Sequence, residues 1–375
     1  MTVYILPIQP LEERYTEQWY RWFPEEFVRQ GVDPVIIDGQ ALTQGIEVGT
    51  FLDINSTLFY QASQLQAIAA LFHSKVIEDG DVFFVADIEF WGIDSIRYLA
   101  TLNKIDIKMY VFAHAGSYTK EDFFSPCASF ARHYEEAWGK IFDKIFVGSL
   151  YHKEQLVKLR DISPEKIIVT GNPYDFNDNV LPKSYDCVKE DIVVHTNRPD
   201  PEKRPDHTLS LFQYLRKHHP SWRFQLLTGR QQWGTGNTRD RALAMQKEGI
   251  LEIYEGLEKE EYIDLLSTAQ VMTGNSIEEN FGYCILEACL VNTIPILPNH
   301  CSHPELVGGD TGCLFDQDYA IPETFPSFNY DQAFLIEQAM ETPFDVVGYA
   351  SLYCDSLLTI VEECLRDYDH SQDGI

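Results

Sequence analysis

The chain has 375 residues, and its 29 lysines and arginines against 58 aspartates and glutamates give a formal charge of −29 at pH 7. This length suits two domains of ordinary size. The acidic balance argues against broad binding to nucleic acid or to a membrane surface, although it is compatible with a local basic cleft.

The eight cysteines include no Cys-x-x-Cys pair, which predicts reduced thiols and no zinc site. No signal peptide is recognisable at the start, and no apolar run is long enough to cross a membrane. The sequence therefore predicts a cytoplasmic protein without a membrane span. The GxGxxG and Walker patterns are absent, which argues against a dehydrogenase or an NTPase.

The first half of the chain alternates short apolar runs with helical stretches. Helices are expected from about Tyr15 to Gly31, with a restart at Pro24, and over 56–76. This alternation predicts an α/β domain with a parallel, doubly wound sheet, which we place at 1–178. A closing helix at about 346–370 is expected to pack back on it. The predicted strands are 3–6, 35–37, 81–87, 107–114, 144–149 and 166–173.

A polar stretch from Tyr174 to Lys189 reads as the interdomain linker, and the alternation restarts after it. We place a second Rossmann-like domain at 179–345, and the simplest architecture has the two domains facing each other across a cleft. The predicted strands are 191–195, 223–227, 251–254, 271–273 and 294–297, and the predicted helices are 205–217, 238–247, 259–267 and 283–291.

The stretch from Ser276 to Ala288 joins a predicted strand end to a predicted helix. It holds two carboxylates, Glu279 and Glu287, eight positions apart across the turn Phe281-Gly282. In open parallel sheets ligands bind at the carboxyl ends of strands, beside helix N-termini. The pair is therefore well placed to hold a hydroxyl-rich ligand. The alternative is that both glutamates are solvated surface acids.

The second domain opens with a proline-rich turn that carries two cations, Arg198 and Lys203. The turn lies between a predicted strand and a predicted helix. Two cations beside helix-start amides suit a diphosphate. The alternative is a basic surface turn without a ligand.

Together these pieces resemble the retaining family-4-type nucleotide-sugar glycosyltransferases of the GT-B fold. Those enzymes carry an Arg-x4-Lys element, matched by Arg198 and Lys203, and a Glu-x7-Glu block around Phe-Gly, matched by Glu279 and Glu287. The likeness covers about residues 190–315, and the first half matches in outline. The remaining matches are a strand that ends in Gly229, the run Pro304-Glu305-Leu306 and the downstream Gly312.

The resemblance implies a hexosyl- or pentosyltransferase that uses a UDP- or GDP-sugar, needs no cofactor or metal, and keeps the donor's anomeric configuration. Glu287 would accept hydrogen bonds from the ribose hydroxyls. Arg198 and Lys203 would hold the diphosphate, whose charge grows as the glycosidic bond breaks. Glu279 would contact the donor sugar. The other implied donor contacts are Gly229, Asn280, Phe281 and Gly282.

In the first domain the resemblance points to His114, at a strand exit, as a residue near the sugar, with Gly116 allowing close approach of substrate. The glycine pair usual after the first strand is absent, which leaves the acceptor side open. Arg14 and Tyr15 begin a segment that interleaves arginine with aromatics and would stack a planar acceptor. Alternatively those aromatics pack on the sheet. Asp87 leaves a neighbouring strand and would bind acceptor hydroxyls or amines, or is a surface acid.

For the acceptor, the chain is also similar to the tRNA-queuosine mannosyltransferases and to phage-type enzymes that glycosylate hydroxymethylated pyrimidines in DNA. Both imply a modified nucleobase as acceptor and a nucleic-acid partner, and the phage type implies the host cytoplasm. The alternatives are a polysaccharide, a lipid-linked sugar or a small molecule. A non-catalytic module that binds nucleotide-sugars is the alternative of another class.

Overall fold

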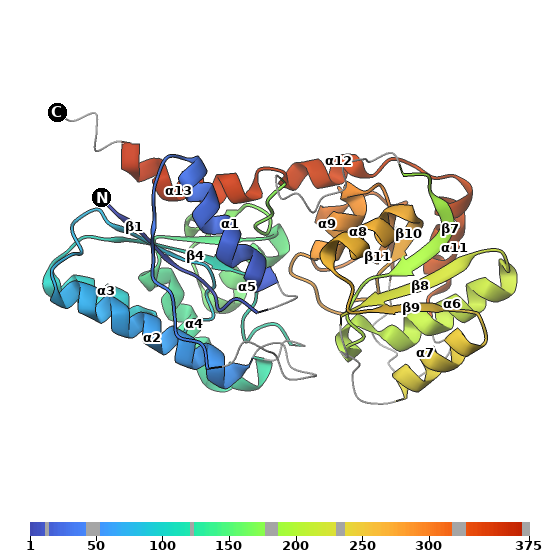
Figure 1. Cartoon of the computed structure of the whole chain (residues 1–375), viewed down its shortest axis with the longest axis horizontal. Coiled ribbons are helices and arrows are strands. Elements are labelled where there is room, and N and C mark those ends of the chain that lie inside the picture. Colours follow the sequence, from blue (N-terminus) through green and yellow to red (C-terminus); the bar gives the residue numbers. More distant parts are fainter. Residues whose placement is uncertain are drawn as a thin grey trace. The chain divides into compact units, whose positions relative to one another are not determined.

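The computed structural model describes residues 1–11, 15–42, 53–120, 124–176, 187–229, 237–316 and 328–369. The chain forms two compact units, Met1–Asp175 with Tyr353–Ile375, and Phe176–Leu352. Each is an α/β unit around a six-stranded parallel sheet (Figure 1). None of the helices in the described ranges has the length and apolar character that crossing a membrane requires.

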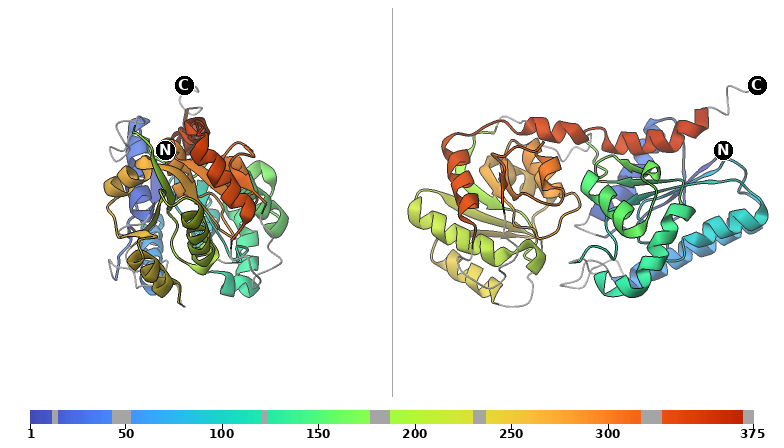
Figure 2. Two further views of the ribbon diagram at one scale, coloured as in Figure 1. Left: turned by 90° about the vertical axis from the view of Figure 1, so that its right-hand side faces the viewer. Right: turned by 180° about the vertical axis from the view of Figure 1, so that it is seen from behind.

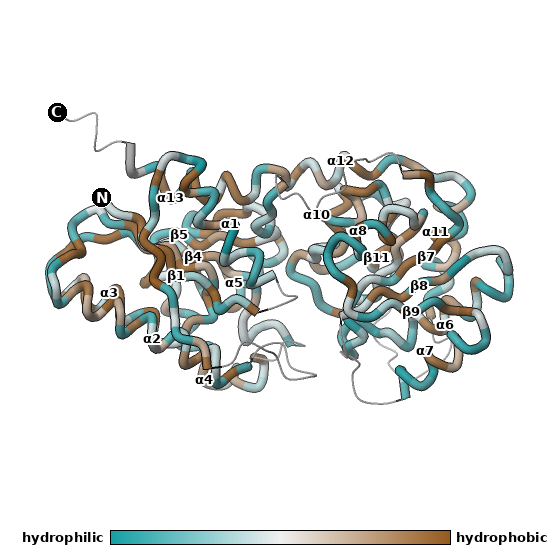
Figure 3. The backbone as a smooth tube through the Cα atoms, in the orientation of Figure 1, coloured by the Kyte–Doolittle hydropathy of each residue, from teal (hydrophilic) through white to brown (hydrophobic). Residues whose placement is uncertain are grey.

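In the first unit the strand order is β2-β1-β3-β4-β5-β6. Apart from the lysines that open β4 and β5, the strands are apolar because helices cover both faces of a parallel sheet, and Figure 3 shows this hydrophobic character around β1 and β4. The strands are β1 (Val3–Leu6), β2 (Val35–Ile36), β3 (Val82–Val85), β4 (Lys108–Ala113), β5 (Lys144–Val147) and β6 (Ile167–Val169).

Alternate side chains of these strands enter two different cores, because successive residues of a strand point to opposite faces. Phe83 and Val85 join the core built with helices α2 to α5. Phe84 points the other way and packs on Phe23 of α1, with ring centroids 4.6 Å apart. Helix α13 packs against α1 (Figure 2). The helices are α1 (Tyr15–Arg29), α2 (Ile54–His73), α3 (Asp94–Asn103), α4 (Ala128–Ile141), α5 (Leu150–Arg160) and α13 (Ser356–Asp369), with short turns η1 (Ser125–Cys127) and η2 (Pro164–Lys166).

In the second unit the strand order is β12-β11-β10-β7-β8-β9. The chain starts in the middle of this sheet at β7, builds outward to β9, and returns to the other side of β7 with β10. The direction of winding thus reverses between β7 and β10, where open α/β sheets bind ligands. The strands are β7 (Glu190–His195), β8 (Arg223–Thr228), β9 (Glu252–Glu255), β10 (Ala269–Thr273), β11 (Ile294–Pro298) and β12 (Leu314–Phe315).

The helices of this unit connect its strands in the usual βα alternation. They are η3 (Pro201–Lys203), α6 (Pro205–His218), α7 (Thr238–Lys247), α8 (Lys259–Thr268), α9 (Tyr283–Leu290), α10 (His303–Leu306), α11 (Tyr330–Glu341), α12 (Val347–Ala350) and η4 (Ser351–Tyr353).

The strands and helices predicted from the sequence are present within a few residues, with two corrections. Helix α1 runs through Pro24 without a restart. The closing helix is not continuous: α12 ends at Ala350, and α13 begins at Ser356 after the turn η4. Most of the predicted linker, residues 177–186, lies outside the described residues.

Candidate functional site

The loop that follows β7 carries the Arg-x4-Lys element. β7 ends at His195, and the turn η3 ends at Lys203. The next residue, Arg204, has a left-handed backbone with φ of 51° and precedes α6. The loop leaves the carboxyl end of the strand at the point where the winding of the sheet reverses. Lys203 is buried, whereas the Arg198 side chain is 32% exposed.

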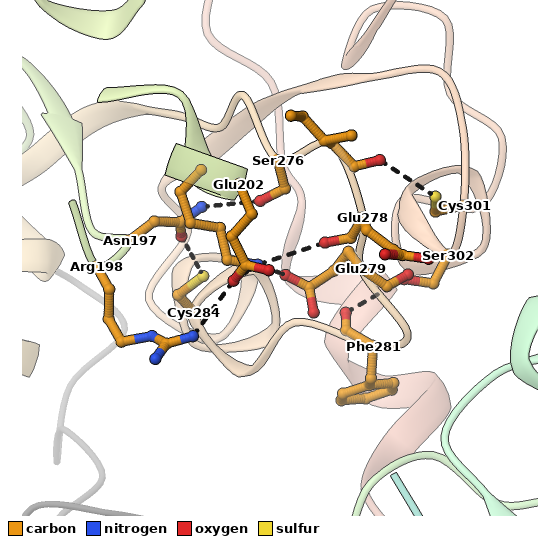
Figure 4. Close-up of polar contacts among 12 residues, drawn as sticks. Asn197, Arg198, Glu202, Ser276, Glu278, Glu279, Phe281, Cys284, Cys301 and Ser302 are labelled. Atoms are coloured by element: carbon orange, nitrogen blue, oxygen red, sulfur yellow. Dashed lines mark hydrogen bonds and ion pairs between the residues drawn. The ribbon is translucent and has the colours of Figure 1, made fainter. Parts of the chain in front are cut away.

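Both cations of this loop contact carboxylates. The Lys203 Nζ atom lies 2.9 Å from Glu279 Oε2 and 3.5 Å from Glu202 Oε1. Arg198 places Nη2 3.2 Å from the same Glu202 oxygen and Nη1 3.2 Å from Asp200 Oδ2. Figure 4 shows the Arg198 guanidinium directed at Glu202. The predicted phosphate ligands and Glu279 therefore belong to one charged cluster.

Burial and charge act in opposite directions on this cluster. Burial disfavours the ammonium form of Lys203, but Glu279 and Glu202 outweigh it and raise the pKa of Lys203. Burial also disfavours the carboxylate of Glu279, but Lys203 and the backbone N–H of Phe281 lower the pKa of Glu279 below its ordinary value. For Glu202 burial prevails over Lys203 and Arg198, and its pKa is raised. Lys203 and Glu279 are thus a charged buried pair.

Glu287 lies on α9 and is buried. Its carboxylate forms an ion pair with Lys259, the first residue of α8. The Lys259 ammonium lies 5.2 Å from the centroid of the Tyr262 ring. Burial, followed by the charge of Glu287, raises the pKa of the Tyr262 phenol. Glu287 is therefore held by a lysine of the adjacent helix, a partner that no local sequence pattern indicates.

Cys284 connects the two glutamates to the loop after β7. Its Sγ donates to Asn197 Oδ1 at 2.9 Å, and Asn197 Nδ2 donates to Ser276 Oγ at 3.1 Å (Figure 4). Burial, followed by the charges of Glu279 and Glu287, raises the pKa of the Cys284 thiol to about 12. Both glutamates therefore lie near a neutral thiol at the start of α9. Arg198, Lys203, Glu279 and Glu287 converge on the β7–β10 switch point.

The backbone between the two glutamates is held by Ser302. Its Oγ donates to the carbonyl of Glu279 at 2.9 Å and to that of Phe281 at 3.4 Å. Gly282 has φ of 98°, a conformation that strains any other residue, and it caps α9. Asn280 is half-buried beside it, and the Phe281 side chain is buried. The loop is thus a fixed backbone surface at a helix N-terminus.

Gly229 and His303 also belong to the second unit. Gly229 directly follows β8, at the same carboxyl edge of the sheet. His303 is buried next to Glu279, and burial lowers the pKa of His303 to about 3, so its ring is neutral. Among the described residues, no group of three His, Cys, Asp or Glu side chains is arranged to hold a metal ion.

In the first unit His114 follows β4 and contacts two predicted site residues. Its Nε2 lies 3.0 Å from the Tyr15 hydroxyl, and its Nδ1 lies 3.1 Å from Asp87 Oδ1. Asp87 leaves β3, the neighbouring strand. Trp19 packs edge-on against the His114 ring, with centroids 6.2 Å apart. Arg14 lies outside the described residues.

The absence of a side chain at Gly116 leaves room for the ring of Tyr118. A Cβ atom at this position would lie 2.4 Å from Cε1 of Tyr118. The Tyr118 hydroxyl is fixed 2.5 Å from His152 Nε2. Burial, followed by the charge of His114, lowers the pKa of His152 to about 3. The glycine therefore lets the loop after β4 pack tightly on a buried, neutral histidine.

The aromatic residues of α1 settle one alternative. Trp19, Trp22, Phe23 and Phe27 are buried, and Trp19 packs on Phe112 of β4 with centroids 5.0 Å apart. The buried rings of Trp19, Trp22 and Phe23 are therefore not available to stack on a planar acceptor, whereas Tyr15 and Tyr20 are half-buried. Tyr15, like Trp19, contacts the His114 ring, with ring centroids 5.5 Å apart.

The sequence reasoning missed Glu202, Lys259, Asn197 and Ser302. Glu202 carries a signal in retrospect, since it is an acid directly before the predicted phosphate-binding Lys203. The other three are separated from their partners by 23 to 87 residues, and only the fold brings them together.

Comparison with known proteins bears on the C-terminal part of the chain and on the fold. Residues 181–322 match the family model described as glycosyl transferases group 1. Among curated proteins, none has a sequence that matches this chain. Solved structures share the fold at low sequence identity, and such a likeness bears on the fold alone.

Three of these structures illustrate the likeness. Sucrose-phosphate synthase from Thermosynechococcus elongatus is 12% identical with a TM-score of 0.67, and the match covers 100% of both chains. Anabaena HepE, solved in complex with UDP, is 13% identical with a TM-score of 0.58, again over 100% of both chains. The pneumococcal O-GlcNAc transferase GtfA, solved with UDP and GlcNAc, is 16% identical with a TM-score of 0.56. That match covers 84% of this chain and 60% of GtfA, so the chain spans less than two thirds of that relative.

The two parallel sheets, their strand orders and these matches agree with one another. The chain has the GT-B fold, and residues 181–322 match the model of the glycosyl transferases group 1 family.

Proposed function

We propose that this protein is a retaining glycosyltransferase that moves a hexose or pentose from a UDP- or GDP-sugar to an acceptor hydroxyl. The observation that carries the proposal is the convergence of Arg198, Lys203, Glu279 and Glu287 on the β7–β10 switch point. Two cations and two acids at such a point match the chemistry of a diphosphate between a ribose and a sugar.

Arg198 and Lys203 are assigned to the diphosphate. As the glycosidic bond breaks, negative charge accumulates on the leaving diphosphate, and cations already in place stabilise that charge more than the ground state. Lys203 is oriented by Glu279 at 2.9 Å, so its ammonium needs little reorganisation. This assignment calls for no divalent metal as a charge carrier.

Glu287 is assigned to the ribose and Glu279 to the donor sugar. A carboxylate accepts two hydrogen bonds from a vicinal diol, and the Glu287 carboxylate is positioned by its ion pair with Lys259. Glu279 reaches the sugar together with the backbone of Asn280, Phe281 and Gly282, which Ser302 holds. Gly229 leaves space for the nucleotide at the end of β8.

His114 is assigned a catalytic role on the N-terminal side, with the Tyr15 hydroxyl in hydrogen-bond contact with Nε2 and the Asp87 carboxylate 3.1 Å from Nδ1. A carboxylate at Nδ1 favours the tautomer with the proton on that nitrogen. In a front-side retaining reaction the leaving phosphate accepts the acceptor's proton, so His114 binds substrate hydroxyls and need not act as a strong base. The transition state then has oxocarbenium character.

The acceptor is proposed as a hydroxyl compound. The resemblance implies a modified nucleobase of DNA or tRNA, but Trp19, Trp22 and Phe23 of α1 are buried, and the chain carries a charge of −29. Polysaccharide, lipid-linked and small-molecule acceptors are therefore tested beside it.

The experiment is a panel of UDP-, GDP- and ADP-sugars, with donor hydrolysis and transfer followed by released nucleoside diphosphate. We expect turnover with one of them, and NMR of the product should show the donor's anomeric configuration. Tight nucleotide binding without any turnover would instead identify a binding module. UDP-sugars are the first choice because HepE and GtfA were both solved with UDP.

A further inference from the structure

The charged cluster after β7 has more carboxylates than cations. Arg198 and Lys203 contribute two positive charges, and Asp200, Glu202 and Glu279 contribute three negative ones within 3.5 Å of them, a formal sum of −1. A nucleoside diphosphate brings further negative charge. Its binding is therefore favoured when a carboxylate that lies between the two cations becomes neutral.

Two of the three acids, Glu279 and Asp200, are not the groups that take up a proton. Glu279 is held by Lys203 at 2.9 Å, and Lys203 together with the Phe281 N–H lowers its pKa, so it stays ionised. Asp200 Oδ2 lies 3.2 Å from Arg198 Nη1, and the Asp200 side chain is 31% exposed, so it can turn to solvent.

Glu202 differs from both. Its Oε1 atom bridges the two cations, 3.2 Å from Arg198 Nη2 and 3.5 Å from Lys203 Nζ. Its side chain is 18% exposed. The backbone of the turn is fixed, because the Glu202 carbonyl accepts from the Ile277 N–H at 2.8 Å. Glu202 thus occupies the place between the two cations to which the phosphate oxygens are assigned, and its backbone is anchored there.

The charged groups that face Glu202 come from two loops. Arg198, Asp200 and Lys203 belong to its own loop, and Glu279 belongs to the loop after β10. Burial already raises the pKa of Glu202, and the two neighbouring acids add to this. A diphosphate beside the same cations weakens their hold on the Glu202 carboxylate and raises its pKa further.

We propose that Glu202 is a proton-linked counterion of the donor site, which bridges Arg198 and Lys203 in the free protein and takes up one proton when the diphosphate binds. This inference rests on the proposed function. The proton comes from solvent, and the carboxylate becomes a neutral acid whose O–H can donate to a phosphate oxygen. When the diphosphate leaves, the proton returns to solvent and the carboxylate again neutralises the cations.

Proton uptake has two measurable consequences. Diphosphate affinity falls as pH rises, by up to tenfold per pH unit wherever the free site is ionised and the occupied site is protonated. Replacement of Glu202 by its neutral isostere removes this dependence and strengthens binding at high pH. A residue with a merely structural role would weaken binding when replaced.

The test is calorimetric titration of the full-length protein with UDP, GDP and ADP, using the tightest of the three. Measurements in two buffers of different ionisation enthalpy, between pH 6 and pH 8.5, give the number of protons taken up. The nucleotide's own phosphate titrates in every protein variant, so the difference between wild type and Glu202→Gln isolates Glu202. We expect that difference to approach one proton, with tighter binding by Glu202→Gln at pH 8.5.

Glu252→Gln is the matched control. Glu252 binds Arg223 at the amino ends of β8 and β9, away from the loop after β7, and this variant should keep wild-type proton uptake. If Glu202→Gln does not fold, Glu202→Asp retracts the acid from the cations and should shift the pH midpoint of uptake.

Equal proton uptake by wild type and Glu202→Gln would overturn the inference and leave the donor site intact. A different failure identifies the proposed function itself as wrong: none of the three nucleotides binds, or Arg198→Ala binds them as well as wild type. Either of these two results would contradict the inference about Glu202 together with the proposed function.

Discussion

The Lys203 ammonium and the Glu279 carboxylate lie 2.9 Å apart, although 76 residues separate them in the chain. The first is assigned to the donor's diphosphate and the second to its sugar. The pair therefore couples the two halves of the donor before any substrate is present. Both side chains are largely buried, so their charges depend on one another.

This dependence predicts an unequal effect of single and double replacements. Lys203→Met leaves Glu279 without its main counterion and should lower the free energy of unfolding by about 3–5 kcal/mol. The double variant Lys203→Met with Glu279→Gln removes both charges and should recover most of that loss, yet remain inactive. Urea titrations followed by circular dichroism measure the effect. Losses that simply add in the double variant would show that the pair is not coupled.

Arg198 offers a test of the leaving-group assignment without a large effect on stability, because its side chain is partly exposed. Arg198→Ala should lower kcat/KM by about 2–4 kcal/mol in transition-state terms and weaken donor binding by less. Arg223→Ala, which breaks an ion pair at the amino ends of the strands, is the control and should leave the rate unchanged. A wild-type rate for Arg198→Ala would contradict the mechanism.

Glu287 tests the ribose assignment. Glu287→Ala should weaken nucleoside diphosphate binding by about 1.5–3 kcal/mol, the contribution of hydrogen bonds to a charged group. The fold should persist, because the released Lys259 side chain is 33% exposed and can turn to solvent. Calorimetry measures the affinity, and Glu337→Gln, which lies in an ion pair with His219 on other elements, is the control. Unchanged affinity in Glu287→Ala removes the ribose assignment.

Asp87 and Tyr15 contact opposite sides of the His114 ring, which predicts a graded loss of transfer activity. His114→Ala should lower kcat/KM about 100-fold, and Asp87→Asn should lower it less, by disturbing the tautomer. His133→Ala is the control, since that side chain is 80% exposed on α4. Steady-state kinetics with the donor found in the panel decide the matter. If His114→Ala keeps full activity, His114 has only a structural role at the end of β4.

Three buried histidines predict destabilisation in acid. Burial lowers the pKa of His152 to about 3, of His195 to about 4 and of His303 to about 3. The unfolded chain binds these protons near pH 6.5, so the stabilisation is complete above that pH and is lost as pH falls. By pH 5 each histidine should cost about 2 kcal/mol.

Urea midpoints at pH 7.5 and pH 5 test this expectation. His152→Gln, which keeps an acceptor for Tyr118, should be less stable at pH 7.5 but show a smaller decrease on acidification. His133→Gln, exposed on α4, should follow the wild type at both pH values. A pH response of His152→Gln equal to that of the wild type would show that His152 is not neutral in the fold.

Local sequence patterns predict the strands and most of the helices, because the residues that form each of these elements are close together in the chain. The run Val82–Val85 is apolar at every position since both faces of its sheet are covered. The errors had equally physical sources. Pro24 allowed α1 to continue because the rings around it are packed on the sheet. The closing helix is interrupted at η4, between Ala350 and Ser356, and the residues between them include no proline or glycine that would predict the break.

The sequence by itself determined the two α/β units and the positions of Arg198, Lys203, Glu279 and Glu287 at strand ends, because periodicity and turn chemistry act over a few residues. Only the tertiary structure decided their partners. Glu202 between the two cations and Lys259 beside Glu287 follow from strand order and helix packing. Such long-range contacts depend on the whole chain's packing, which no short stretch of sequence records.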